Sequence, residues 1–276
     1  MQFGIDVSQQ RIDWDELVAR VQFGEACGFT GAWGFDHFQP MYGEGPGNCF
    51  DGMTTLAAFA SATTRIRLGL LVAGVTYRHP SIFTAQALTI DHASHGRLDL
   101  SLGAAWFGPE HHALGIPFPT AGTRFDLLDD ALEIVTRLMT GERVSYAGAQ
   151  LSLDGAQMRP LPVQRPHPPI WIGSNGPQRG LPAAAKWADV WHTFAPSEHY
   201  AVMSKRVDQL AEEAGRDPAA IRRAGSLSIS EPWDEVRRNA DALRAVGVSY
   251  LVCSWPGDGE ARVGEFAERV MSEFTE

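Results

Sequence analysis

The chain has 276 residues, 44% of them hydrophobic and 20% charged, which is the composition of a water-soluble globular protein. Its formal net charge of −10 argues against binding to nucleic acid or to an anionic membrane, and no apolar run approaches the ~20 residues that span a bilayer. Three widely spaced cysteines, with no CxxC pair, argue against a disulfide framework or a zinc knuckle. The first residues lack the pattern of a signal peptide, so we expect a cytoplasmic protein.

Short apolar runs alternate with longer amphipathic ones in the first half of the chain. Strands are predicted at residues 3–7, 31–35, 67–72 and 98–103, and helices at 14–27, 51–63, 81–94 and 125–140. The last of these helices carries one apolar stripe formed by Leu128, Leu132, Val135 and Met139. Such alternation is typical of parallel strands joined by right-handed crossovers.

The alternation stops between residues 141 and 169. A hairpin is predicted at 144–153, around Ala147-Gly148, and a proline-rich run follows it. We interpret this segment as an insertion over the mouth of the fold. The alternation then resumes, with strands at 170–173, 190–194, 227–230 and 250–254, helices at 178–187, 197–213, 234–246 and 261–274, and a short helix at Asp217-Pro218.

The count of eight strands favours a closed barrel over a doubly wound sheet, which usually has five or six. The first strand is also followed by no GxGxxG motif. We therefore predict an α/β fold, a (β/α)8 TIM barrel that forms a single domain over residues 1–276, with a hairpin and loop insertion at about 141–169 after the fourth helix. In such a barrel the chemistry lies at the carboxyl ends of the strands.

Asp36-His37-Phe38-Gln39-Pro40 directly follows the second predicted strand. An imidazole titrates near neutrality and a carboxylate can orient it, so the pair can form an acid–base element. The alternative is that Asp36 caps a turn and that His37 is simply solvated.

Small residues follow two later strands. Gly103-Ala104-Ala105, before Trp106 and Glu110, would let the backbone approach a flat ring closely. Gly173-Ser174-Asn175-Gly176 precedes a helix whose N-terminal N–H groups suit a phosphate, with Arg179 nearby. Many connections between a strand and a helix look like this second segment, so by itself it is weak support for a phosphate site.

These segments resemble the bacterial luciferase-like superfamily. The resemblance is carried by Asp36 to Pro40, by Gly96-Arg97 with Leu102-Gly103, Trp106, Glu110 and Gly115, and by the proline-rich approach from Gln164 to Pro169. The first and last of these segments are similar to the branch that uses the deazaflavin coenzyme F420. The resemblance implies a TIM-barrel oxidoreductase that transfers hydride between coenzyme F420 and a small organic substrate.

The resemblance also implies roles for individual residues. Asp36 would contact the pyrimidine edge of the deazaflavin, and His37 would lie beside the reacting carbon. A non-prolyl cis peptide at Leu71–Val72 would back the middle ring. The cofactor would be bound by Asp36, Leu71, Val72, Gly103, Ala104 and Ala105, and its phosphate by Gly173, Ser174, Asn175, Gly176 and Arg179.

The chain departs from the sugar-phosphate dehydrogenases of this family at three positions. Trp106 and Pro109 stand where those enzymes have a catalytic Glu and an Asn, and Met41 stands in place of a substrate-facing Trp. The substrate is therefore expected to differ. The candidate catalytic residues are His37, Trp106 and Glu110, and a structural role is the alternative for Glu110.

Relatives pair through the helices that follow the second and third strands, which implies a homodimer; Ala57, Ala58 and Ala60 give the first of these helices a small-residue face. Other points stay open from sequence alone. Strand alternation turns only one of Trp191 and His192 toward the cavity, and Trp33, Trp106, Trp191 and Trp255 could each line a pocket or lie in the core.

Three alternative functions are considered. One is an FMN-dependent monooxygenase on the same scaffold. Another is a metal-dependent barrel hydrolase or isomerase, but Glu110-His111-His112 lacks ligand spacing such as HExxH, so no metal is expected. The third, a non-catalytic barrel that binds a ligand, would not need Asp36 and His37 at a strand end.

Overall fold

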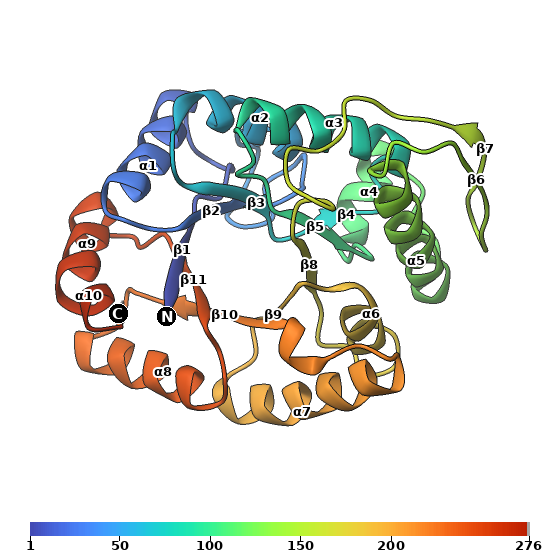
Figure 1. Ribbon diagram of the computed structural model, residues 1–276. Coiled ribbons are helices and arrows are strands. Elements are labelled where there is room, and N and C mark those ends of the chain that lie inside the picture. Colours follow the sequence, from blue (N-terminus) through green and yellow to red (C-terminus); the bar gives the residue numbers. More distant parts are fainter. Residues whose placement is uncertain (275–276) are drawn as a thin grey trace.

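A parallel sheet curves into a nearly closed barrel that is surrounded by helices, as seen in the computed structural model, which describes residues 1–274 (Figure 1). The strands are β1 (Gln2–Asp6), β2 (Gly31–Gly34), β3 (Arg67–Leu70), β4 (Ala73–Gly74), β5 (Leu100–Gly103), β8 (Ile170–Gly173), β9 (Val190–Thr193), β10 (Arg222–Ser228) and β11 (Tyr250–Ser254). They pair in the order β3-β2-β1-β11-β10-β9-β8-β5-β4. A parallel bridge between Leu68 and Leu98 links β3 to the strand region before β5. The TIM-barrel prediction is confirmed; β3 lies within the strand predicted at 67–72, and β4 directly follows the end of that predicted strand.

The helices form the outer layer. They are α1 (Trp14–Ala26), α2 (Gly52–Ala62), α3 (Pro80–Ala93), α4 (Gly108–Leu114), α5 (Ala121–Leu138), α6 (Gly180–Trp187), α7 (Ser197–Glu213), α8 (Trp233–Ala245), α9 (Gly259–Phe266) and α10 (Ser272–Phe274). A 3₁₀ turn lies at Pro218–Ala220, and a π-helical turn at Ala267–Met271 joins α9 to α10. Among the described residues, no helix has both the length and the apolar content to cross a bilayer.

Aromatic side chains fill the inside of the barrel. The rings of Trp33 and Trp171 lie 4.2 Å apart between centroids, and the indole Nε1 of Trp33 donates a hydrogen bond of 3.1 Å to the hydroxyl of Tyr250. Gly4 makes room for them, because a Cβ there would lie 2.4 Å from Trp33 Nε1. The inside of the barrel is thus a packed core and not an open channel.

Two predicted boundaries are wrong, one because of a local cap and one because of tertiary contacts. The helix predicted from residue 125 begins at Ala121 as α5, because Thr120 caps it by accepting a hydrogen bond of 3.3 Å from the Thr123 N–H. The strand predicted at 227–230 begins at Arg222 as β10. Its two arginines obscured the strand pattern, although Arg223 is buried and its guanidinium donates to Ser204 and to Asp208.

The predicted hairpin exists, but its predicted position over the mouth of the barrel is wrong. Strands β6 (Val144–Ala147) and β7 (Ser152–Ala156) pair antiparallel and lie on the outer side of α5 (Figure 1). Val144 packs against Ile134 and Leu138 of α5. The physical reason is chain direction: a connection from the end of α5 to the start of β8 runs near the amino ends of the strands, away from the mouth.

Candidate functional site

A cavity of about 560 Å³ opens at the carboxyl ends of the strands. Most of the residues predicted for the site line it: Asp36, His37, Leu71, Val72, Gly103, Ala104, Ala105, Trp106, Gly173, Ser174 and Asn175. Glu110, Gly176 and Arg179 lie outside the lining of the cavity. The rule that barrel chemistry follows strand ends therefore located the cavity correctly.

The end of β2 is fixed by a buried glutamine. The side chain of Gln9 donates to the carbonyl oxygen of Phe35 and accepts a hydrogen bond of 3.2 Å from the Phe35 N–H. Gln9 thus bonds the backbone of Phe35 as a neighbouring strand would, one residue beyond the last residue of β2. This contact sets the direction in which the next residues, Asp36 and His37, leave the strand.

Asp36 forms a buried pair with Arg78. Nη1 and Nη2 of Arg78 lie 2.6 Å and 2.9 Å from the two carboxylate oxygens of Asp36, and the Gly74 N–H donates a third bond of 3.0 Å. Burial alone would lower the pKa of Arg78, but its contacts with Asp36 keep the pKa above its usual value. Asp36 lines the cavity as one half of an ion pair, with one acceptor position remaining on Oδ1.

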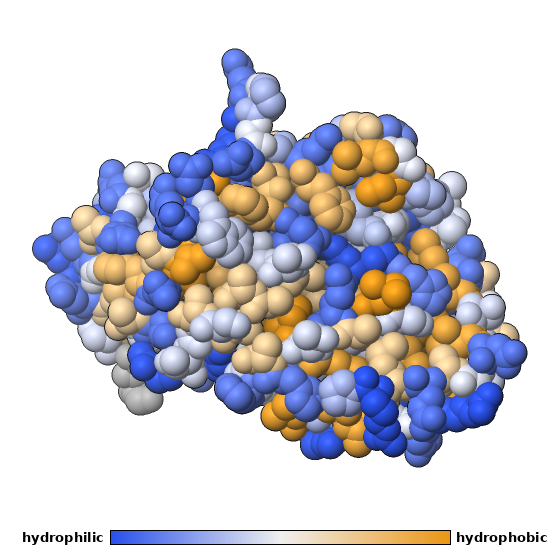
Figure 2. Space-filling view, turned by 90° about the horizontal axis from the view of Figure 1, so that it is seen from above, coloured by the Kyte–Doolittle hydropathy of each residue, from blue (hydrophilic) through white to orange (hydrophobic). Residues whose placement is uncertain are grey.

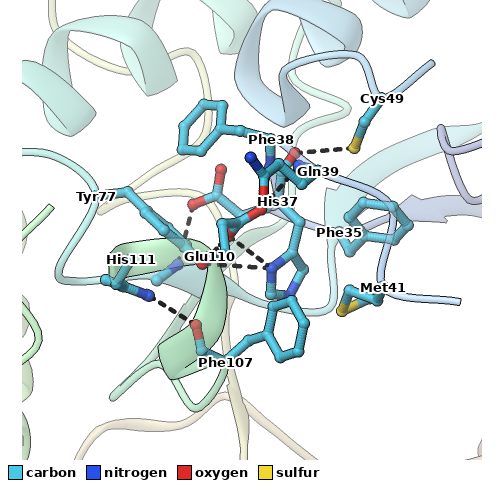
Figure 3. Close-up of polar contacts among 12 residues, drawn as sticks. Phe35, His37, Phe38, Gln39, Met41, Cys49, Tyr77, Phe107, Glu110 and His111 are labelled. Carbon is cyan, nitrogen blue, oxygen red and sulfur yellow. Dashed lines mark hydrogen bonds and ion pairs between the residues drawn. The ribbon is translucent and has the colours of Figure 1, made fainter. Parts of the chain in front are cut away.

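His37 is held by Glu110, which is fully buried (Figure 3). Nδ1 of His37 lies 3.0 Å from Oε2 of Glu110, and the hydroxyl of Tyr77 donates to the same oxygen. The backbone N–H groups of Phe38 and Gln39 donate to Oε1 at 2.7 Å and 2.8 Å. Burial alone would raise the pKa of Glu110, but these four contacts lower it to about 2.

The charge on Glu110 fixes the proton on His37. An ionised carboxylate only accepts hydrogen bonds, so Nδ1 must carry a proton. Within residues 1–274, Nε2 of His37 makes no hydrogen bond, and the His37 ring lines the cavity. Nε2 is therefore the atom that can take up or release a proton there.

A second buried histidine, His111, packs against the Tyr77 ring of this network. His111 stacks on Tyr77 with ring centroids 4.6 Å apart. Its Nδ1 lies 2.8 Å from the carbonyl oxygen of Phe107 and its Nε2 lies 2.6 Å from the hydroxyl of Thr76. Both nitrogens are thus engaged, and the ring holds Tyr77 in place.

The predicted cis peptide at Leu71–Val72 is confirmed, and it lies in the cavity wall between β3 and β4. The structure corrects the reason given for Gly103. A Cβ on Gly103 would lie 2.5 Å from Cγ2 of Val72, and one on Gly173 would lie 2.9 Å from Cγ1. Both glycines therefore make room for the Val72 side chain.

The segment after β8 is partly open to solvent, and Asn175 is exposed there. Ser174 lines the cavity, and its Oγ lies over Gly180, where a Cβ would come within 1.7 Å of it. Arg179 does not reach the cavity wall. Its guanidinium pairs with Asp126 at 2.7 Å and with Asp129 at 3.3 Å, both on α5.

Strand β9 turns His192 toward the cavity and Trp191 toward the helices. Trp191 packs against Tyr200 of α7 and donates 2.8 Å to the carbonyl oxygen of Ser174. His192 lines the cavity, with Nε2 3.0 Å from the hydroxyl of Ser226. Burial lowers the pKa of His192 to about 4, so it is neutral at pH 7. Of the four tryptophans left open by the sequence, only Trp106 lines this cavity within the described chain.

Comparison with known proteins identifies the family. The profile described as luciferase-like monooxygenase matches residues 1–269. The chain belongs to this family. A relative from Mycobacterium tuberculosis, named F420-dependent hydroxymycolic acid dehydrogenase, is 29% identical over 243 residues, which are 87% of this chain and 66% of that relative. The chain thus matches about two thirds of that relative's length.

Two solved structures have the same fold as this luciferase-like chain. The coenzyme F420-dependent tetrahydromethanopterin reductase of Methanopyrus kandleri superposes with a TM-score of 0.86 at 19% identity, covering 99% of both chains. The monooxygenase RslO1 of Streptomyces bottropensis superposes with a TM-score of 0.81 at 22% identity, covering 100% of both. At these identities the likeness concerns the fold alone.

Sequence reasoning missed two residues of the luciferase-like site. Tyr77 and Arg78 carried no predicted role, yet Tyr77 binds Glu110 and Arg78 binds Asp36. Their signal was position, since both follow the third predicted strand at the mouth end of the barrel. The partners lie 33 and 42 residues away along the chain, so no local pattern could pair them.

Proposed function

We propose that the chain is an oxidoreductase that transfers hydride between coenzyme F420 and a small organic substrate. The observation that carries the proposal is the pairing of a fixed histidine with a wall of small residues in one cavity. Family membership and an F420-dependent relative support the choice of cofactor. A cytoplasmic location is part of the proposal and agrees with the three free cysteines, Cys27, Cys49 and Cys253.

The cavity fits a flat ring system. Ala104 and Ala105 present only methyl groups along one side, and Leu71 and Val72 form the adjoining wall, with the Val72 side chain packed against Gly103. Oδ1 of Asp36 retains an acceptor position for a ring N–H. Ser174 and Asn175, at the mouth end of β8, would meet the phosphate, with Gly176 beside them, while Arg179 stays paired with Asp126 and Asp129 of α5. When bound, F420 supplies a two-electron hydride donor or acceptor.

The chain's own contribution is proton transfer and orientation. Nε2 of His37 accepts the proton that leaves the substrate oxygen, or returns it in the opposite direction. Glu110 and Tyr77 are positioning residues, because they bind the other ring nitrogen and keep Nε2 turned to the cavity. Trp106, the third predicted catalytic residue, has no acidic proton and lies with its ring centroid 6.1 Å from that of His37. We assign Trp106 to substrate contact.

The competing proposal is an FMN-dependent monooxygenase, since the family description is that of a monooxygenase. Titration of the purified protein with oxidised F420 and, separately, with FMN distinguishes the two. Tighter binding of F420, followed as a change in its fluorescence, is the expected result. Equal affinities, or tighter binding of FMN, would overturn the F420 proposal.

We further propose a homodimer formed through α2 and α3. Figure 2 views this face, where apolar and weakly polar side chains run across the middle and hydrophilic residues gather at the ends. The exposed or half-exposed positions of the two helices are small or uncharged, among them Ala57, Ala58, Ile82 and Ala85. Ala60, predicted for this face, is buried within the subunit. Light scattering at micromolar concentration should give twice the monomer mass. The Ala58→Arg variant should instead have the mass of one monomer.

A further inference from the structure

We propose that the substrate is an uncharged alcohol, or the matching carbonyl compound, whose carbinol carbon is attached to a large apolar group. The proposal rests on the function proposed above and adds the class of substrate. It is carried by the charge of the cavity wall and by three aromatic side chains at its opening.

The cavity wall offers no cationic side chain to an anionic substrate held beside His37. Within residues 1–274, neither a lysine nor an arginine lines it. The one carboxylate there, on Asp36, is already neutralised by Arg78. His192 carries no charge at neutral pH and hydrogen-bonds Ser226 instead. A phosphate or carboxylate of the substrate, held beside His37 and away from the segment after β8 that would meet the cofactor's phosphate, would lose its hydration without gaining a cation, which is costly.

Three exposed aromatic side chains surround the opening, and we call them the aromatic rim: Tyr42, Trp106 and Phe194. Their exposed fractions are 65%, 64% and 75%, and all three line the cavity. They come from the segments after β2, β5 and β9, so they stand on different sides of the barrel mouth. Exposed apolar surface gathered around a cavity is typical of a ligand-binding site.

The aromatic rim lies next to the polar groups of the cavity. The Trp106 ring is 6.1 Å from the His37 ring, and the Phe194 ring is 4.8 Å from the His192 ring. A substrate whose hydroxyl reaches Nε2 of His37 therefore places its apolar group between these rings. The oxidation balances: the carbinol C–H bond breaks to give a hydride to oxidised F420, the O–H proton goes to Nε2 of His37, and a C=O bond forms.

The test measures binding separately from turnover. The protein is loaded with reduced F420, which cannot accept hydride, and is titrated calorimetrically with 2-alkanols of increasing length and with hydroxy acids of matched length. We expect each added methylene to lower Kd by up to about four-fold. We expect the carboxylate to raise Kd at least ten-fold over the neutral alcohol of the same length.

Substitutions test whether the aromatic rim causes the dependence of Kd on chain length. Trp106→Ala and Phe194→Ala should flatten the dependence of Kd on chain length. Val202→Ala removes a side chain that is 69% exposed on α7, away from the cavity lining, and should keep that dependence. A Kd that does not change with length, or hydroxy acids that bind as tightly as alcohols, would overturn the proposed substrate class. So would equal flattening in all three variants.

A failure of the proposed function gives a different result. If F420 does not bind in a fluorescence titration, the cofactor proposal fails, and the same alkanol and hydroxy acid series is then titrated into the protein without F420. A retained dependence on length and charge would still support the substrate class, and its loss would overturn it.

Discussion

The wall of the cavity that follows β2, β4 and β5 is held by two buried networks of side-chain hydrogen bonds, whereas the side chains of the wall that follows β8 and β9 make single bonds, from Trp191 to the Ser174 carbonyl oxygen and between His192 and Ser226. On the first wall, Asp36 and Glu110 together accept bonds from Arg78, His37, Tyr77 and three backbone N–H groups. On the second wall, Asn175 and Phe194 are exposed.

This difference matches the different requirements of proton transfer and of ligand contact. A group that moves a proton needs one orientation and one defined protonation state, and buried networks provide both. A group that meets a ligand needs access to solvent, and the second wall and the aromatic rim provide that. The two walls should therefore differ in energy as they do in structure.

The largest effect is expected from His37→Ala. Turnover should fall by ~10²–10⁴-fold, since this removes the acid–base group, while the affinity for F420 should change far less. Stopped-flow measurement of F420 reduction and a fluorescence titration give the two quantities. A histidine with a purely structural role would show the reverse: weaker binding and nearly unchanged turnover in the remaining folded protein.

Asp36→Asn should have the next largest effect, on stability. It leaves the guanidinium of Arg78, which is 11% exposed, without its main counter-charge, and loss of one partner of a buried pair costs about 3–5 kcal/mol. Urea denaturation measures the change. Asp51→Asn is the matched control, because Asp51 is more exposed, lies 3.3 Å from the same arginine, and caps α2 in a way that Asn can replace. A similar loss in both variants would contradict the assignment.

His192→Gln should change the pH dependence of stability. The unfolded chain binds a proton at His192 below about pH 6.5, whereas the folded chain does so only near pH 4. Stability therefore falls as the pH drops through this interval, by up to about 3 kcal/mol from this group. In His192→Gln, the loss of melting temperature between pH 6.5 and 4 should be smaller than in the parent.

Asp6, at the end of β1, provides a control of opposite sign. Burial raises its pKa from 3.8 to about 6, and the hydrogen bond from Ser8 opposes this. The stability that protonated Asp6 contributes is present below about pH 4 and is lost as the pH rises to 6. Asp6→Asn should therefore stabilise the protein above pH 6 and change little at pH 4. If both variants shifted the profile in the same direction, the buried-histidine explanation would fail.

The smallest effect is expected from Arg179→Ala on the second wall. Its two pairs, with Asp126 and Asp129, are exposed, so stability should change by less than ~1 kcal/mol. The affinity for F420 should fall no more than a few-fold, because Arg179 is already engaged by those carboxylates. A loss of a hundred-fold that vanished at high salt would mean that Arg179 leaves α5 to hold the phosphate.

Much of the fold follows from local pattern. The alternation of apolar and amphipathic segments predicted the barrel, and the positions after each strand predicted most of the cavity lining. The two arginines at the start of β10 obscured the strand pattern, so the predicted strand began too late. The cap at Thr120 was not recognised, so the predicted helix also began later than α5 does. The first error arises because the tertiary contacts of Arg223 with Ser204 and Asp208 satisfy a residue that local propensity disfavours, whereas the second arises from a local cap that was not recognised.

The organisation of the site was less predictable. The sequence indicated His37 and Glu110, but not that one binds the other across 73 residues. The position of the hairpin also depends on the direction of α5 and on a contact outside the local pattern: Asp130 accepts hydrogen bonds from the N–H groups of Gln150 and Leu151. Periodicity along the chain carries no information about such long-range pairing.

The hairpin on the outer side of α5 offers a point of attachment for immobilising the protein. Gln150 is exposed at its turn and uses only its backbone N–H to bind Asp130. A thiol introduced by Gln150→Cys could be coupled to a maleimide surface, since Cys253 is buried and Cys27 and Cys49 are only partly accessible. Among the described residues, the hairpin contributes nothing to the cavity lining, so molecules tethered there would keep the barrel mouth open to the surrounding solution.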